Sequence, residues 1–142
     1  MKVLFDTSIV LDVLLDRKPF SEFAAQLFSK VEKGQLSGVL CGTTITTIEY
    51  LARKSLGAKG AVRQIRNLLT LFEIAPINRL VLESALGGRF SDFEDAVLAE
   101  AAAHVGAEGI VSRDPAGFKF SRIPVYDPRE LLIMLESDKK EG

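Results

Sequence analysis

The chain opens with MKVLFDTSIVLDVLL (residues 1–15), in which a short apolar stretch meets an acidic residue and then a helical pattern. Residues 2–5 are β-rich and predict a buried strand. The apolar positions Ile9, Val10, Val13 and Leu14 then recur with the spacing of a helix. Asp6 stands between the two patterns. The stretch therefore predicts a strand that passes directly into a helix, with Asp6 at the carboxyl end of the strand.

The rest of the chain continues this alternation. Further strands are predicted at residues 36–41, 72–75, 109–112 and 123–126. Helices are predicted at residues 19–33, 44–56, 58–71, 78–86 and 92–105, and from residue 127 onward. Ser91 and Asp127 are the expected N-caps of the last two helices. Strands and helices that alternate with short links predict an α/β fold, with a parallel sheet of four to five strands covered by helices on both faces.

Length and composition limit the possible classes of protein. The 142 residues predict a single domain at residues 1–136 with a polar C-terminal tail at residues 137–142. The net charge of −1 argues against attachment to nucleic acid by bulk positive charge, although it allows a local basic rim. The single cysteine, Cys41, predicts a buried, inert thiol in a reducing, cytoplasmic compartment. No secretory signal or membrane-spanning apolar run is expected.

Four acidic residues lie at predicted strand ends or one helical turn beyond them: Asp6, Glu49, Asp95 and Asp114. The carboxyl ends of parallel strands meet at one edge of a sheet, where open α/β proteins bind their ligands. Acids gathered there repel one another unless a cation joins them. Oxygen ligands of this kind suit Mg²⁺ or Mn²⁺.

Each of these acids also has a purely structural interpretation. Asp6 could cap a helix, Glu49 could lie on a solvated helix face, and Asp114 could belong to a turn. Asp92 and Asp95 share the first turn of a helix, where the helix dipole favours negative charge. Alanines on the same face as Asp95 predict that this helix lies close to the sheet. The only histidine, His104, is expected at a helix C-terminus rather than in a site.

Four segments resemble the sequence motifs of PIN domains. They are FDTSIVLD (residues 5–12), TTIEY (46–50), DFEDAVLAEAA (92–102) and IVSRD (110–114). The third resembles the variant that carries F-E-D-A, and the fourth resembles a motif in which Thr-Arg-Asp or Thr-Arg-Asn is common. Ser8 stands where asparagine is frequent, and Ser112 replaces the common threonine. Neither departure removes an acid, and the four matches follow one another in order along nearly the whole chain.

The resemblance implies a three-layer α/β/α domain and a ribonuclease that depends on Mg²⁺ or Mn²⁺. Asp6, Glu49, Asp95 and Asp114 would be the catalytic, metal-binding acids, and Asp92 an accessory metal ligand. Small PIN domains are often VapC-like toxins, so an antitoxin partner and a homodimer are expected, with RNA as the substrate.

An acidic pocket repels RNA, so basic or polar residues must hold the substrate around it. Ser8, Arg53, Arg89 and Arg113 are the candidates for substrate binding. Two other functions stay open: a PIN fold that binds RNA or protein without catalysis, and a phosphotransfer domain. A haloacid-dehalogenase-like phosphatase would want an aspartate where Ser8 stands, and Arg113 is a poor substitute for the lysine of a receiver domain.

Overall fold

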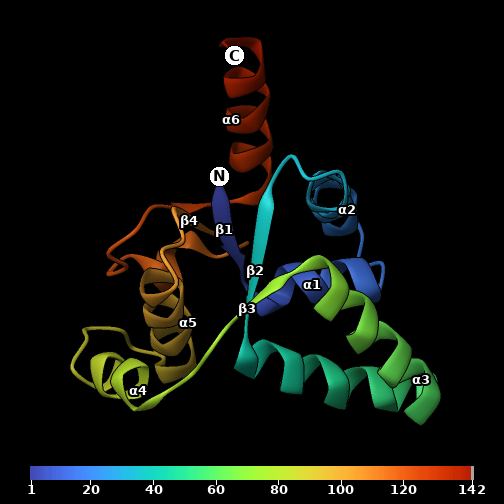
Figure 1. Ribbon diagram of the computed structural model, residues 1–142, viewed down its shortest axis with the longest axis horizontal. Coiled ribbons are helices and arrows are strands. Elements are labelled where there is room, and N and C mark those ends of the chain that lie inside the picture. The colour runs from blue at the N-terminus through green and yellow to red at the C-terminus, as the bar shows by residue number, and fades with distance from the viewer. Residues whose placement is uncertain (142) are drawn as a thin grey trace.

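The computed structural model describes the backbone of residues 1–141 and the side chains through residue 137. Its centre is one parallel sheet of five strands: β1 (Lys2–Phe5), β2 (Ser37–Cys41), β3 (Glu73–Ala75), β4 (Gly109–Val111) and β5 (Val125–Tyr126). The strands lie in the order β3-β2-β1-β4-β5 (Figure 1). The predicted α/β fold and the number of strands are confirmed.

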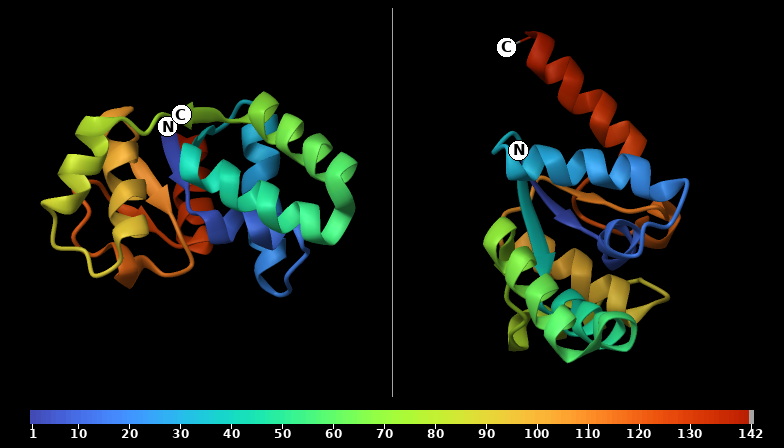
Figure 2. Two further views of the ribbon diagram at one scale, coloured as in Figure 1. Left: turned by 90° about the horizontal axis from the view of Figure 1, so that it is seen from below. Right: turned by 90° about the vertical axis from the view of Figure 1, so that its right-hand side faces the viewer.

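The helices form a layer on each face of this sheet. They are α1 (Thr7–Leu14), α2 (Phe20–Glu32), α3 (Gly42–Leu71), α4 (Arg79–Leu86), α5 (Phe93–His104) and α6 (Pro128–Glu141), with a short 3-10 helix, η1 (Pro115–Phe118). Residues of α1, α2, α3 and α6 share one buried cluster with Val3 and Phe5, while α4 and α5 share another with Leu4. Alternate residues of β1 thus point into opposite layers, which Figures 1 and 2 show on either side of the sheet.

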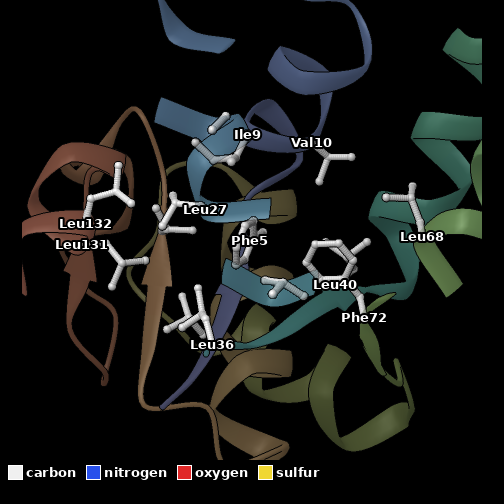
Figure 3. Packing of buried hydrophobic residues seen from close by; sticks show 14 of the residues in the cluster. Phe5, Ile9, Val10, Leu27, Leu36, Leu40, Leu68, Phe72, Leu131 and Leu132 are labelled. Carbon is white, nitrogen blue, oxygen red and sulfur yellow. The ribbon is translucent and has the colours of Figure 1, made fainter. Parts of the chain in front are cut away.

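An aromatic cluster holds the carboxyl end of β1 in place. The ring centroids of Phe5 and Phe72 lie 5.2 Å apart, and those of Phe5 and Phe28 lie 5.9 Å apart, in edge-to-face geometry. Figure 3 shows Phe5 among Leu27, Leu40 and other buried side chains. Because Phe5 is fully buried, the next residue, Asp6, leaves the sheet at a fixed point.

The alanine-rich face of α5 is buried, as the sequence predicts. Ala96, Ala99 and Ala102 are nearly inaccessible and pack in the cluster that contains Leu4 and Ile110. Small side chains let this helix lie close to the sheet. The first turn of α5, which carries Asp95, is thereby held near the strand ends.

Helix α3 contains both of the helices expected at residues 44–56 and 58–71. It breaks at Gly57, with φ 76° and ψ 175°, and folds back there (Figure 2). Ser91 was the wrong cap, since Asp92 accepts the hydrogen bond from the backbone N–H of Asp95. Asp127 does cap α6, accepting from the N–H of Glu130 at 2.8 Å.

The C-terminal segment is more regular than the expected polar tail. Helix α6 continues through residue 141, and Gly142 lies outside the described residues. Among the residues that the structure describes, no helix has the length and apolarity to cross a membrane.

The order of the strands defines where a ligand can enter. From β1 the chain builds outward through β2 and β3 on one side, and then crosses to β4 and β5 on the other. The two strands at this switch are β1 and β4, which pair through Leu4 and Ile110. A crevice opens outside the carboxyl ends of such a strand pair. Asp6 follows β1 directly, and Asp114 follows β4 by three residues.

Candidate metal and catalytic site

Asp6 and the loop after β4 are joined by a buried serine. The hydroxyl of Ser112 donates to Oδ2 of Asp6 at 2.7 Å, and the same oxygen of Ser112 accepts from the backbone N–H of Asp114 at 3.0 Å. Ser8 also donates to Oδ2 of Asp6, at 3.3 Å. Asp6 stands at the N-cap position of α1, but its side chain makes no capping hydrogen bond there. Its carboxylate instead accepts from Ser112.

Asp114 and Asp95 meet around Gly117. A Cβ atom built on Gly117 would lie 2.9 Å from Oδ2 of Asp114 and 3.3 Å from Oδ2 of Asp95. Two carboxylate oxygens, one from the loop after β4 and one from α5, thus flank a space that any side chain at position 117 would fill. The absence of a side chain at this position keeps the space between the two acids open.

The electrostatics of Asp6 and Asp95 show that the acids act on one another. Burial raises the pKa of Asp95 from 3.8 to about 6, and the charges of Asp92, Asp6, Glu94 and Asp114 act in the same direction. Burial also raises the pKa of Asp6, and Asp114 adds to this, whereas the hydrogen bonds from Ser112 and Ser8 oppose it. Asp6, Asp95 and Asp114 therefore belong to one electrostatic cluster.

Asp92 supports this cluster from its edge. Its Oδ1 accepts from the N–H of Asp95 at 3.2 Å, so its carboxylate caps α5, and its charge is the largest contribution from another acid to the raised pKa of Asp95. Asp92 is exposed to solvent.

Glu49 forms an ion pair on its own helix. It lies in the second turn of α3, where its carboxylate binds Arg53 with distances of 2.7 Å to Nε and 2.6 Å to Nη2. The start of α3 nevertheless touches the start of α1, because the hydroxyls of Thr44 and Thr7 lie 2.8 Å apart. In this arrangement the charge of Glu49 is met by Arg53 rather than shared with Asp6.

Arg113 is bound within the protein. Its guanidinium donates to both oxygens of Asp12, from Nε at 2.7 Å and from Nη2 at 3.1 Å, and its Cζ lies 3.9 Å from the centre of the Phe20 ring. Asp12 is completely buried and also lies 2.9 Å from Nε of Arg17, a contact without hydrogen-bond geometry. Sequence reasoning did not single out Asp12. Its position on the apolar face of α1 was the available signal.

The remaining residues predicted to bind substrate differ in their surroundings. Ser8 contacts Asp6 directly. The Arg53 side chain is about half exposed beside Glu49. Arg89 lies outside α4 and stacks on Phe120, with its Cζ 4.4 Å from the ring centre. The structure thus gathers Ser8 with the acids and leaves Arg89 at a separate surface.

The donor set fits a hard divalent cation. Among the described residues, no three His, Cys, Asp or Glu side chains stand close enough to form a ready-made metal site. Mg²⁺, however, usually binds one or two carboxylates and completes its shell with water. Asp95 and Asp114 offer two carboxylates across the open space at Gly117, and Asp6 lies beside them. A cation there would also relieve the repulsion that raises the pKa of Asp95.

Comparison with protein families gives one match. The family model described as the PIN domain matches residues 2–116, which contain every strand but β5 and all of the acids of the candidate site. No curated protein sequence shows significant similarity to the chain.

Solved structures with the same fold come from several bacteria. FitAcB from Neisseria gonorrhoeae aligns with a TM-score of 0.68 at 19% identity, covering 89% of this chain and 98% of that one. A toxin–antitoxin complex from Klebsiella pneumoniae gives 0.68 at 23% identity, covering 89% and 97%. VapC20 of Mycobacterium tuberculosis, described as a sarcin–ricin loop cleaving toxin, gives 0.64 at 15% identity, covering 86% and 98%. At these identities the likeness establishes a shared fold.

Proposed function

Because the chain belongs to the PIN-domain family, we propose that it is an endoribonuclease that hydrolyses RNA phosphodiester bonds with the help of Mg²⁺ or Mn²⁺. The observation that carries the proposal is the convergence of Asp6, Asp95 and Asp114 at the carboxyl ends of β1 and β4. A divalent cation would neutralise the charges of acids that raise one another's pKa in this way.

Asp95 and Asp114 would hold the cation directly, and Asp6 would join them, oriented by Ser112 and Ser8. When bound, a divalent cation lowers the pKa of water and stabilises the charge that develops on a phosphate. One of these carboxylates would also take a proton from the attacking water. Asp92 would shape the local field and serve as an accessory ligand.

Glu49 enters the proposal through its match to the family motif. Arg53 contacts Oε1 of Glu49 through both Nε and Nη2. A cation bound to Glu49 would compete with this ion pair and leave Arg53 to meet an RNA phosphate. Arg89 and the exposed part of Arg113 are the further candidates for the RNA backbone.

The partners of the proposed enzyme follow from the similar structures. One of them is a toxin–antitoxin complex and another is a toxin, which supports a toxin role and an antitoxin partner for this chain. The resemblance to VapC-like toxins adds a cytoplasmic location and a homodimer to the proposal. A small DNA-binding protein encoded directly upstream of this chain would support the antitoxin, and the subunit mass in solution, measured by light scattering, tests the dimer.

The enzymatic proposal is tested with purified protein and fluorescent single-stranded RNA. We expect cleavage in Mg²⁺ or Mn²⁺ that EDTA abolishes and that Asp6→Asn removes without changing the circular dichroism spectrum. Glu22→Gln is the matched control, since Glu22 is an exposed acid in the first turn of α2. The ion pair of Glu49 with Arg53 favours one alternative, a catalytically silent binding module. That module would bind the RNA and leave it uncut in every condition.

A further inference from the structure

A pocket of about 340 Å³ is lined by residues of α3, α4 and α5. One wall carries the hydroxyl side chains of Thr43, Thr46 and Thr47 from the first turns of α3. We call it the threonine pocket. Its volume is at the lower end of the range for small-molecule sites, which is sufficient for one nucleobase.

The opposite wall is apolar apart from one acid. Leu82 of α4 and Val97 of α5 line it, together with Phe93 and Glu94 from the first turn of α5. Phe93 is 49% exposed beside this pocket. An exposed ring of this kind offers a surface on which an unpaired base can stack.

Both walls are tied to the proposed catalytic acids by the chain itself. Glu94 precedes Asp95, and its charge contributes to the raised pKa of Asp95. On the other side, Thr44 follows Thr43 and its hydroxyl contacts that of Thr7, the neighbour of Asp6. A nucleotide with its phosphate at the acids would therefore have the threonine pocket within reach of its base or of the adjacent base.

Most polar groups of the threonine pocket present acceptors, while the hydroxyl of Thr47 can donate or accept. Thr43 donates its hydroxyl proton to the sulfur of Cys41, and Thr46 donates its proton to the carbonyl oxygen of Thr43. Their oxygens are left with lone pairs, and the carboxylate of Glu94 is an acceptor only. The negative charge of Glu94 also disfavours a phosphate in this position. The occupant should be an uncharged group that carries several N–H donors.

We propose that the threonine pocket binds an unpaired guanine base of the RNA substrate and so sets where the chain is cut. Guanine alone among the four bases carries two adjacent donors, N1–H and the 2-amino group, on its Watson–Crick edge, and these match the two oxygens of the Glu94 carboxylate. Phe93 stacks on the base, and Leu82 and Val97 contact its apolar surface. This inference rests on the proposed nuclease function and specifies the substrate of the same site.

The test compares two short single-stranded RNAs that contain one guanosine or, in its place, one inosine, which lacks the 2-amino group. We expect wild-type protein to cut beside guanosine about tenfold faster than beside inosine, in keeping with the loss of one hydrogen bond to a charged group. Glu94→Gln should remove this difference. Phe93→Ala should slow the cleavage of both RNAs alike. Glu22→Gln, which also changes a first-turn acid, should preserve the difference.

A binding measurement separates this inference from the proposed function. Asp6→Asn protein is titrated into both RNAs and followed by fluorescence anisotropy, which needs no cleavage. Tighter binding of the guanosine RNA that Glu94→Gln abolishes supports the pocket, even if wild-type protein cuts nothing. Equal binding and cleavage of the two RNAs overturns the inference. So does a guanosine preference that survives Glu94→Gln, or a change of subunit mass in the Phe93→Ala and Glu94→Gln variants with no effect on base preference.

Discussion

The carboxylate of Asp12 and the guanidinium of Arg113 form a two-point ion pair across 101 residues of sequence, with N–O distances of 2.7 and 3.1 Å. The pair links α1, which begins at Thr7, to the loop that carries Asp114. Since Asp12 is fully buried, the loop is fixed from inside the protein as well as through Ser112.

Asp12→Ala should lower the free energy of unfolding by about 3 kcal/mol, because it leaves two arginines without their buried partner. Urea denaturation measures the change. Glu73→Ala is the control, since Glu73 forms a partly exposed pair with Lys2 and should cost under about 1 kcal/mol. Equal losses for the two variants would show that the buried ion pair contributes no more to the free energy of unfolding than the surface pair does.

The raised pKa of Asp95 predicts how stability depends on pH in metal-free protein. The folded chain holds this proton up to about pH 6, whereas the unfolded chain releases it near 3.8. Between these values the folded state binds more protons, so the free energy of unfolding should fall as the pH rises through this window.

Asp95→Asn should flatten this dependence and stabilise metal-free protein at pH 7.5 by roughly 1 kcal/mol, since the site is partly solvated and screened. Urea denaturation between pH 4.5 and 7.5 measures it. Saturating Mn²⁺ should stabilise wild type more than the variant. If the variant is less stable than wild type at every pH, the Asp95 carboxylate is not destabilised by burial and by the neighbouring acids.

Gly117→Ala should weaken Mn²⁺ binding about tenfold and slow RNA cleavage, because the added methyl group would displace the Asp95 and Asp114 carboxylates. Isothermal titration calorimetry gives the affinity, and circular dichroism checks the fold. Gly87→Ala is the matched control, as its Cβ would meet nothing closer than 3.8 Å. Unchanged affinity in Gly117→Ala would place the cation elsewhere.

Arg53→Ala and Glu49→Gln should move Mn²⁺ affinity in opposite directions if Glu49 is a ligand. Removing Arg53 frees the Glu49 carboxylate and strengthens metal binding, while Glu49→Gln weakens it. If Arg53 also holds the RNA backbone, Arg53→Ala should raise the KM for RNA in spite of its tighter metal binding. If neither variant changes the metal affinity, Glu49 is not a metal ligand and serves as a surface ion-pair partner.

The fold could be predicted from the sequence because the strand patterns, the helical periods and the residues between them all indicated the same alternating α/β arrangement. The strand at residues 2–5, the helical period after it and the acid between them predicted a parallel sheet with Asp6 at its edge, and the structure confirms that arrangement. Ser91 and Asp92 are both good capping residues, and only the backbone geometry decides which of them begins α5.

Two features of the site were beyond sequence reasoning. The Asp12–Arg113 pair joins residues that no local pattern connects, and the space at Gly117 depends on where two distant carboxylates point. By contrast, the pairing of Glu49 with Arg53 could have been anticipated, since acids and bases four residues apart in a helix face each other.

The hydrogen bond from Ser112 to Asp6 can form only after most of the chain has been synthesised. The two residues are 106 positions apart, and β4 must dock beside β1 before they can meet. A growing chain that has already folded α1, α2 and α3 still lacks Asp95 and Asp114, two of the three acids of the cluster. Contacts between residues so far apart form late, because closing the intervening loop costs entropy. Nascent fragments that end before β4 should therefore be harmless to the RNA around the ribosome.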